Sequence, residues 1–98
     1  MNFTLIQSEE FQQQLANLAG SPDLIKRYKA VAKCLRLLAS NPRHPGVNTH
    51  KYSSLVGPND GDVFEAYAEN KTPGAYRVFW YHGPGAREIT LVSVTPHP

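Results

Sequence analysis

The segment at residues 75–81 (AYRVFWY) constrains the fold most strongly, because it combines six apolar or aromatic residues with a single charge, Arg77. Aromatic and β-branched side chains are typical of a central strand. Since side chains alternate along a strand, Tyr76, Val78 and Trp80 are expected on one face, under the helices, and Arg77, Phe79 and Tyr81 on the other. Arg77 then has two interpretations. It is either a structural arginine paired with a carboxylate or an anion-binding group on an open face.

The rest of the chain divides into predicted elements at clear capping and turn signals. Residues 3–6 predict a short edge strand, and Ser8 is the expected N-cap of a helix that ends at Gly20. A second helix is expected from the Ser21-Pro22 cap to the stop at Asn41-Pro42. Residues 41–62 form a long connection with a short extended piece near 51–55. Further strands are predicted at residues 63–68, 75–81 and 88–95.

This β-α-α-β-β-β order predicts an α+β fold, in which a helical hairpin packs on one face of a small, mostly antiparallel sheet. A length of 98 residues suits one domain spanning residues 1–98. The other face of the sheet would be open, and strand parity predicts that Glu65 and Tyr67 join Arg77 on it.

Composition excludes several classes of protein. The formal net charge of +2 permits contact with nucleic acid without demanding it. Cys34, the only cysteine, leaves no intrachain disulfide, and its place in an apolar helical pattern predicts a buried structural thiol. No signal peptide or membrane-spanning run of about 18 apolar residues is recognised, so we expect a cytoplasmic protein with no membrane partner.

Chemistry on the open face would come from a set of polar and aromatic side chains. Histidine, lysine and glutamate move protons, arginine stabilises phosphate charge, and exposed aromatics stack on unpaired bases. No glycine-rich phosphate loop, HExxH or CxxC motif is present, so no metal or cofactor is expected. These parts suit a metal-free ribonuclease. The candidates are His44, His50, Lys51, Tyr52, Glu65, Tyr67, Arg77, Tyr81 and His97.

Each candidate also has a plain structural interpretation. Glu65 is equally suited to be the ion-pair partner of Arg77 across neighbouring strands. Tyr67 and Tyr81 could be ordinary sheet residues, and His97 part of the C-terminal tail. A further basic row on the second helix is either a solvated face or a surface for RNA or an acidic partner; it comprises Lys26, Lys29, Lys33 and Arg36.

Four segments of this sequence resemble the RelE/ParE superfamily of bacterial toxins. They are LLASNPRHPG (37–46), HKY (50–52), GAYRVFW (74–80) and ITLVSVTPH (89–97), and the order of the predicted elements also matches that family. The resemblance implies the toxin of a type II toxin–antitoxin pair. RelE-like members cleave mRNA in the ribosomal A site, whereas ParE-like members inhibit DNA gyrase.

The same resemblance implies roles for particular residues. Arg77 would stabilise the scissile phosphate, Lys51 matches a basic residue before the second strand of the family, and His97 would act as acid or base. Tyr81 lies near positions where an aromatic stacks on a base, whereas Glu65 rests on strand parity alone. The expected function is an mRNA interferase that cleaves RNA by metal-free attack of the 2′-hydroxyl. Its expected partners are a cognate antitoxin and mRNA, with or without the ribosome. A gyrase-inhibiting toxin and an inactive protein-binding member are the alternatives.

Overall fold

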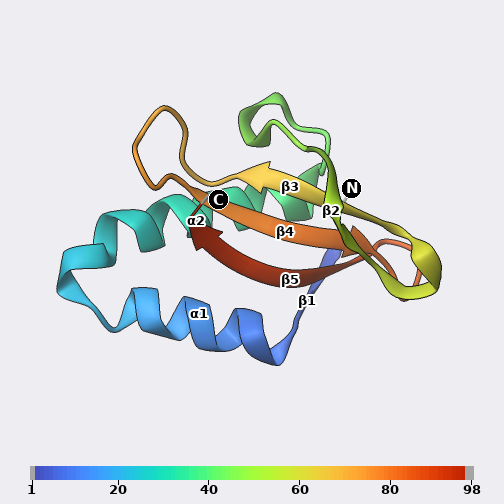
Figure 1. Cartoon of the computed structure of the whole chain (residues 1–98), viewed down its shortest axis with the longest axis horizontal. Coiled ribbons are helices and arrows are strands. Elements are labelled where there is room, and N and C mark those ends of the chain that lie inside the picture. The colour runs from blue at the N-terminus through green and yellow to red at the C-terminus, as the bar shows by residue number, and fades with distance from the viewer. Residues whose placement is uncertain (1, 97–98) are drawn as a thin grey trace.

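The computed structural model describes residues 2–96, which form two helices and a five-stranded sheet (Figure 1). Short 3₁₀ turns lie at Pro22–Leu24, Pro45–Val47 and Pro58–Asp60. Within residues 2–96, neither helix is long and apolar enough to cross a membrane. The helices and strands, in chain order, are β1 (Thr4–Gln7), α1 (Glu9–Ala19), α2 (Ile25–Ser40), β2 (His50–Val56), β3 (Asp62–Tyr67), β4 (Tyr76–His82) and β5 (Glu88–Pro96).

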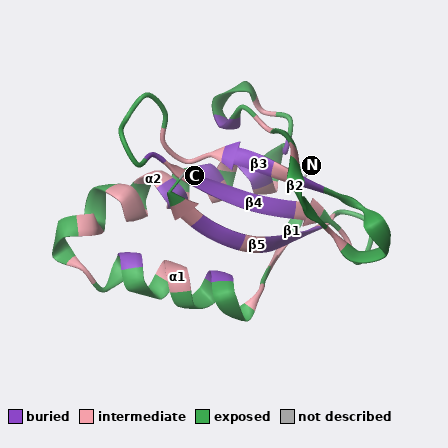
Figure 2. Cartoon of the chain, viewed as in Figure 1, coloured by how far each residue is buried: buried purple, intermediate pink, exposed green. Residues whose placement is uncertain are grey.

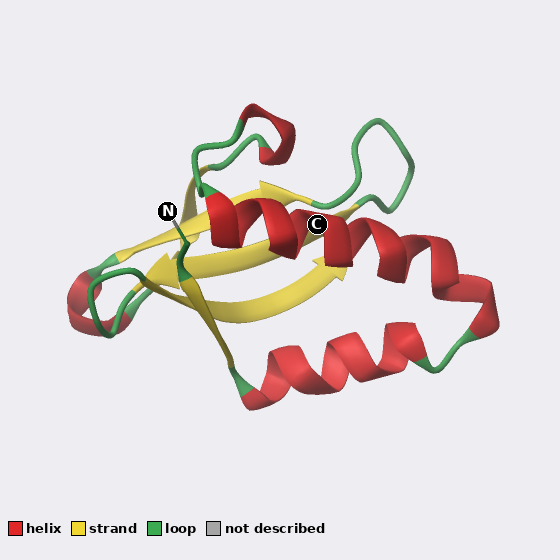
Figure 3. Cartoon of the chain, turned by 180° about the vertical axis from the view of Figure 1, so that it is seen from behind, coloured by secondary structure: helices red, strands yellow, loops and turns green. Residues whose placement is uncertain are grey.

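The sheet has the strand order β1-β5-β4-β3-β2. β1 runs parallel to β5, and every other pair of neighbouring strands is antiparallel. The two helices form an antiparallel hairpin that covers one face of the sheet, as the view from behind shows (Figure 3). The predicted α+β architecture, with a helical hairpin on a mostly antiparallel sheet, is therefore confirmed.

The ends of the helices follow from local hydrogen bonding. The Oγ atom of Ser8 accepts from the Phe11 N–H at 3.0 Å and donates to the Val92 carbonyl at 2.8 Å, so the predicted cap also ties α1 to β5. Ser21 is an N-cap followed by Pro22, as predicted, but of a 3₁₀ turn that leads into α2. Its backbone carbonyl, and not its hydroxyl, accepts from the Leu24 N–H in a 3₁₀ turn, and α2 begins only at Ile25.

The long connection contains a complete strand, where the sequence predicted only a short extended piece. β2 pairs with β3, placing His50 opposite Glu65 and Lys51 opposite Phe64. Most of its side chains are exposed, because the strand is held by backbone pairing rather than by a buried apolar face. In Figure 1, β2 runs in front of the sheet while α2 lies behind it, so β2 covers part of the face that the helices leave free.

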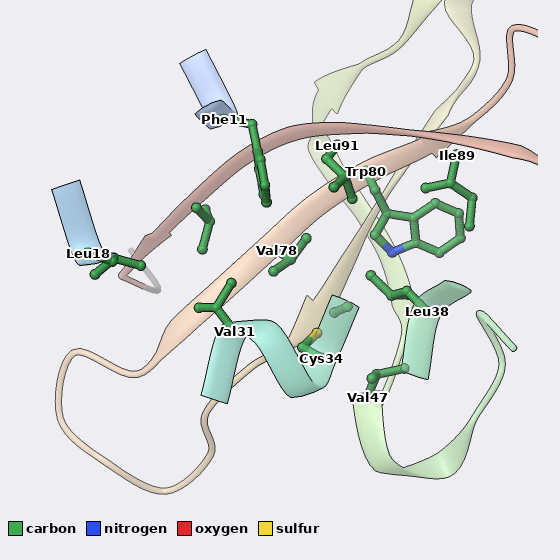
Figure 4. Close-up of a cluster of buried hydrophobic side chains, with 12 residues drawn as sticks. Phe11, Leu18, Val31, Cys34, Leu38, Val47, Val78, Trp80, Ile89 and Leu91 are labelled. Carbon is green, nitrogen blue, oxygen red and sulfur yellow. The ribbon is translucent and has the colours of Figure 1, made fainter. Parts of the chain in front are cut away.

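The core lies between the helices and the sheet (Figure 4). β4 is buried along most of its length (Figure 2), and Val78 and Trp80 point from it toward the helices, as their parity predicts. Burial raises the pKa of the Cys34 thiol to about 12, which confirms the predicted buried thiol. The largest fully buried apolar side chains are Trp80, Phe11, Leu38, Ile89, Leu91, Val31, Val47, Val78 and Val94.

A β-bulge in β5 changes the parity of that strand. Trp80 lies opposite Leu91 while the preceding Phe79 lies opposite Ser93, so Val92 is the extra residue. Leu91 and Val94 therefore both enter the core although they are three positions apart. The bulge also leaves Ser93 on the face that carries Phe79 and Arg77.

Candidate active site

The face of the sheet opposite the helices carries a cluster of charged and aromatic side chains, which we call the β3–β4 cluster. It comprises His50, Glu65, Tyr67 and Arg77. The strand register assembles it, because His50 lies opposite Glu65 and Tyr67 lies opposite Arg77. Glu65 and Arg77 are buried, with only 1% and 7% of their surfaces exposed. Charged groups at that depth need partners, and the cluster supplies them.

The Glu65 carboxylate lies between His50 and Arg77. Its Oε1 atom is 2.8 Å from His50 Nε2, and its Oε2 atom is 3.7 Å from Arg77 Nε. Burial of a carboxylate costs several kcal/mol by ordinary estimates, so each partner offsets part of that cost. Glu65 is therefore the ion-pair partner of Arg77, as one interpretation of the sequence proposed, and it also holds His50.

The Arg77 guanidinium is fixed on several sides. Its Cζ atom lies 3.7 Å from the centroid of the Tyr67 ring, a cation–π contact. Its Nη1 atom donates to the carbonyls of Glu69 and Tyr76. Its Nε atom is buried and makes no hydrogen bond, since Glu65 remains 3.7 Å away. Arg77 is thus a paired arginine whose Nε–H group makes no hydrogen bond.

His50 is the member of the cluster that solvent reaches, with 48% of its side chain exposed. Its Nδ1 atom lies 3.0 Å from the Asn48 carbonyl, and its ring meets Tyr67 edge-on at 5.4 Å between centroids. A carboxylate that binds one imidazole nitrogen fixes the orientation of the ring. Once Nδ1 leaves the Asn48 carbonyl, His50 has the geometry of an oriented acid or base.

Other sequence candidates lie away from this cluster. Lys51 lies opposite Phe64, and its Nζ atom pairs with Asp62 Oδ1 at 3.2 Å on the exposed rim. Tyr81 is four residues along β4 from Arg77 and lines a separate cleft of about 550 Å³ beside the Pro58–Asp60 turn. His97 lies outside the described residues.

The basic row on α2 lies on the other side of the sheet from the β3–β4 cluster. All four of its side chains are exposed, and within residues 2–96 none of them takes part in an ion pair. The structure therefore does not bring this row together with Arg77. Its members remain Lys26, Lys29, Lys33 and Arg36.

Sequence reasoning missed the link between His50 and Glu65, because it depends on the register of β2. It also missed that Tyr52 packs on Phe79, with ring centroids 4.8 Å apart, and so closes part of this face. Within residues 2–96, no group of three or more His, Cys, Asp or Glu side chains is placed to hold a metal ion.

Comparison with solved structures places the fold among bacterial and archaeal toxins. The fold is similar to archaeal RelE from Pyrococcus horikoshii, solved as a RelE–RelB complex, with a TM-score of 0.65 and 18% identity over 98% of this chain and 96% of that one. It is also similar to a YoeB/ParE toxin from Agrobacterium tumefaciens, with a TM-score of 0.71 and 8% identity over 97% and 99% of the two chains.

A third similar structure is the YoeB dimer from Staphylococcus aureus, with a TM-score of 0.68 and 13% identity over the whole of both chains. No protein-family model matches the sequence, and a comparison with curated proteins finds no significant match. The predicted fold of RelE/ParE-type toxins is thus confirmed over nearly the full length of the chain.

Proposed function

We propose that this chain is the toxin of a toxin–antitoxin pair and that its β3–β4 cluster cleaves RNA without a metal ion. One observation carries the proposal: the 2.8 Å contact between His50 Nε2 and Glu65 Oε1, beside the Arg77 guanidinium, on the face of the sheet that the helices leave free. This arrangement combines an oriented acid–base group with a cation, which are the parts that phosphodiester transesterification needs. The protein would act in the cytoplasm as one domain.

In this mechanism His50 is the base and Glu65 its orienting group. His50 Nδ1, which faces the Asn48 carbonyl as a donor, first releases its proton to water and leaves that carbonyl. It then accepts the proton of a ribose 2′-hydroxyl, while Glu65 stabilises the resulting imidazolium through Nε2. The 2′-oxygen then bonds to phosphorus and the bond from phosphorus to the 5′-oxygen breaks. Arg77 stabilises the added negative charge on the phosphate oxygens.

The leaving 5′-oxygen takes a proton from His97, the acid that the family resemblance implies, or from water. The products are a 2′,3′-cyclic phosphate and a free 5′-hydroxyl, so atoms and charge balance with no other reactant. Tyr67 holds Arg77 through its ring, and Tyr81 offers a ring for stacking further along the strand. Lys51, paired with Asp62 on the rim, would contact RNA only after that ion pair opens.

The similarity to RelE from a RelE–RelB complex supports an antitoxin as the protein partner. The exposed lysines of α2 would serve either an acidic segment of that antitoxin or the phosphates of mRNA or of the ribosome. These two uses differ in a measurable way. Replacement of Lys26, Lys29 and Lys33 together would weaken binding of the partner that the row contacts and leave the other unchanged. Loss of neither affinity would show that the row is a solvated face.

Inducible expression in bacterial cells, with primer extension on cellular mRNA, tests the proposal. Growth arrest with discrete mRNA cuts is expected for the natural chain, and both should be lost in His50→Gln and Arg77→Ala but kept in Lys71→Ala, which changes an exposed turn residue. His50 is half-exposed, so its replacement tests chemistry with little risk to folding. Arrest with intact mRNA and altered DNA supercoiling would favour gyrase inhibition instead, and no arrest would contradict a toxin.

A further inference from the structure

The loop between α2 and β2 builds a hollow next to the β3–β4 cluster. This hollow, which we call the loop hollow, has a volume of about 440 Å³, within the range of small-ligand sites. The loop folds through a 3₁₀ turn at Pro45–Val47, which His44 caps by accepting from the Gly46 N–H at 2.9 Å. The residues that line the hollow are Arg43, His44, Pro45, Asn48, Thr49, His50 and Phe64.

The lining of the loop hollow favours an anion. None of its residues is acidic, whereas Arg43 brings a permanent positive charge. The Arg43 side chain is exposed, and within residues 2–96 it takes part in no ion pair. Guanidinium groups bind phosphate oxygens through paired hydrogen bonds, so an unpaired arginine in an acid-free hollow is suited to a phosphate.

Two further donors line the hollow. His44 accepts at Nδ1, so the proton of its neutral ring lies on Nε2, where it can be donated. The Thr49 hydroxyl oxygen is buried and has no hydrogen-bond partner, an uncommon state for such a group. An oxygen-rich ligand in the hollow would satisfy this hydroxyl once the Thr49 side chain rotates toward it.

His50 belongs both to the loop hollow and to the β3–β4 cluster. Because His50 lines both sites, an RNA strand bound at the β3–β4 cluster can extend past His50 into the loop hollow. We propose that the loop hollow is a second anion subsite, which binds the phosphate next to the one that is cleaved. This inference rests on the proposed function, because it assigns the substrate to be a single RNA strand longer than one nucleotide.

Binding of a short 2′-O-methyl RNA oligonucleotide tests the subsite without turnover, because this RNA lacks the attacking hydroxyl. Fluorescence anisotropy between about 50 and 200 mM salt would compare the natural chain with Arg43→Gln, with Thr49→Val and with Arg87→Gln. Arg87 is a matched control, since it is an exposed arginine in the β4–β5 turn, outside the hollow. Unfolding midpoints would verify that each variant is folded.

For Arg43→Gln we expect roughly tenfold weaker binding at low salt and a slope of log affinity against log salt that is less steep by about 0.7, the value for one phosphate contact on a single strand. Thr49→Val should weaken binding about threefold with an unchanged slope, because it removes a donor and no charge. Arg87→Gln should change binding less than twofold. Equal binding by Arg43→Gln and Arg87→Gln would overturn the subsite.

Two competitor arms identify the ligand. Displacement of the RNA by a glutamate-rich peptide at equal concentration, with the same Arg43 dependence, would assign the hollow to an acidic protein segment and overturn the RNA subsite. If binding of inorganic phosphate depends on Arg43 but binding of RNA does not, the hollow is a site for free phosphate and the RNA subsite is overturned. If the chain cleaves no RNA while the Arg43 effect on binding holds, the proposed function fails and the subsite stands. If Arg43→Gln cleaves and binds RNA normally, the subsite fails and the proposed function stands.

Discussion

The ion pair between Glu65 and Arg77 should contribute measurably to stability, and Glu65→Gln tests this most simply. Glutamine keeps the shape of the side chain and can still accept from His50 Nε2, so the substitution removes mainly the negative charge. With 3.7 Å between the groups and an effective dielectric constant of about 20, the two charges attract by roughly 4 kcal/mol. Glutamine also avoids the free-energy cost of burying a carboxylate, and this gain offsets part of the lost attraction. Arg77, however, stays buried with one partner fewer.

We therefore expect Glu65→Gln to lower the free energy of unfolding by about 3 kcal/mol, measured by urea unfolding of the purified chain. For a chain of this size, that corresponds to a decrease in Tm of roughly 12–24 °C. Arg77→Met should cost a similar amount. The double variant should be about 2 kcal/mol more stable than the sum of the single effects predicts, because each substitution removes the same attraction.

The pair of Lys51 and Asp62 is a matched control for this cycle. Its charged atoms lie closer, at 3.2 Å, but both side chains are more than half exposed. Exposed pairs contribute little, so the cycle of Lys51→Met and Asp62→Asn should give a coupling below about 0.5 kcal/mol. If the buried pair shows no larger coupling than this exposed pair, the interpretation of Glu65 as the electrostatic partner of Arg77 is wrong.

The remaining predictions concern the helices. Ser8→Ala should lower the free energy of unfolding by about 1–2 kcal/mol in urea titrations, because the hydroxyl caps α1 and also binds β5; an unchanged midpoint would contradict this. Native Cys34 should react with a thiol reagent near pH 8 about a thousandfold more slowly than in urea, since burial raises its pKa from 9.0 to about 12; equal rates would show an accessible thiol. The triple change of Lys26, Lys29 and Lys33 to glutamine should leave the free energy of unfolding within about 0.5 kcal/mol of that of the natural chain, because all three are exposed and unpaired; a larger loss would mean that these lysines support the fold.

Much of the fold could be predicted because local signals agree with the final packing. The alternation of residues 75–81 correctly placed Val78 and Trp80 in the core and Arg77 on the opposite face. Asn41 before Pro42 correctly ended the second helix, since a residue before proline avoids helical geometry. These features depend on residues close together in the sequence, which is why the sequence alone predicts them.

The missed features depend on pairing between distant segments. β2 carries the exposed run SSLV and has no apolar alternation, so only its backbone bonds to β3 define it as a strand. The contact of His50 with Glu65 follows from that register and has no local signal. The bulge at Val92 likewise changes which residues of β5 face the core, a change that simple alternation cannot predict. For the candidate site, the sequence therefore predicted Arg77 and, from the parity of β3, the presence of Glu65 and Tyr67 on the same face. It did not predict the contact with His50.

The central claim, that His50, Glu65 and Arg77 form an RNA-cleaving site, is tested most directly by the ends of the RNA fragments. The purified chain, with and without ribosomes and in the presence of EDTA, would be incubated with a labelled RNA and with the same RNA carrying a 2′-deoxy sugar at the cleaved position. The account predicts a 2′,3′-cyclic phosphate product from the first RNA, no cut at that position in the second, and no product from His50→Gln. Cleavage at the 2′-deoxy position, cleavage by His50→Gln at the natural rate, or no product with or without ribosomes would contradict it.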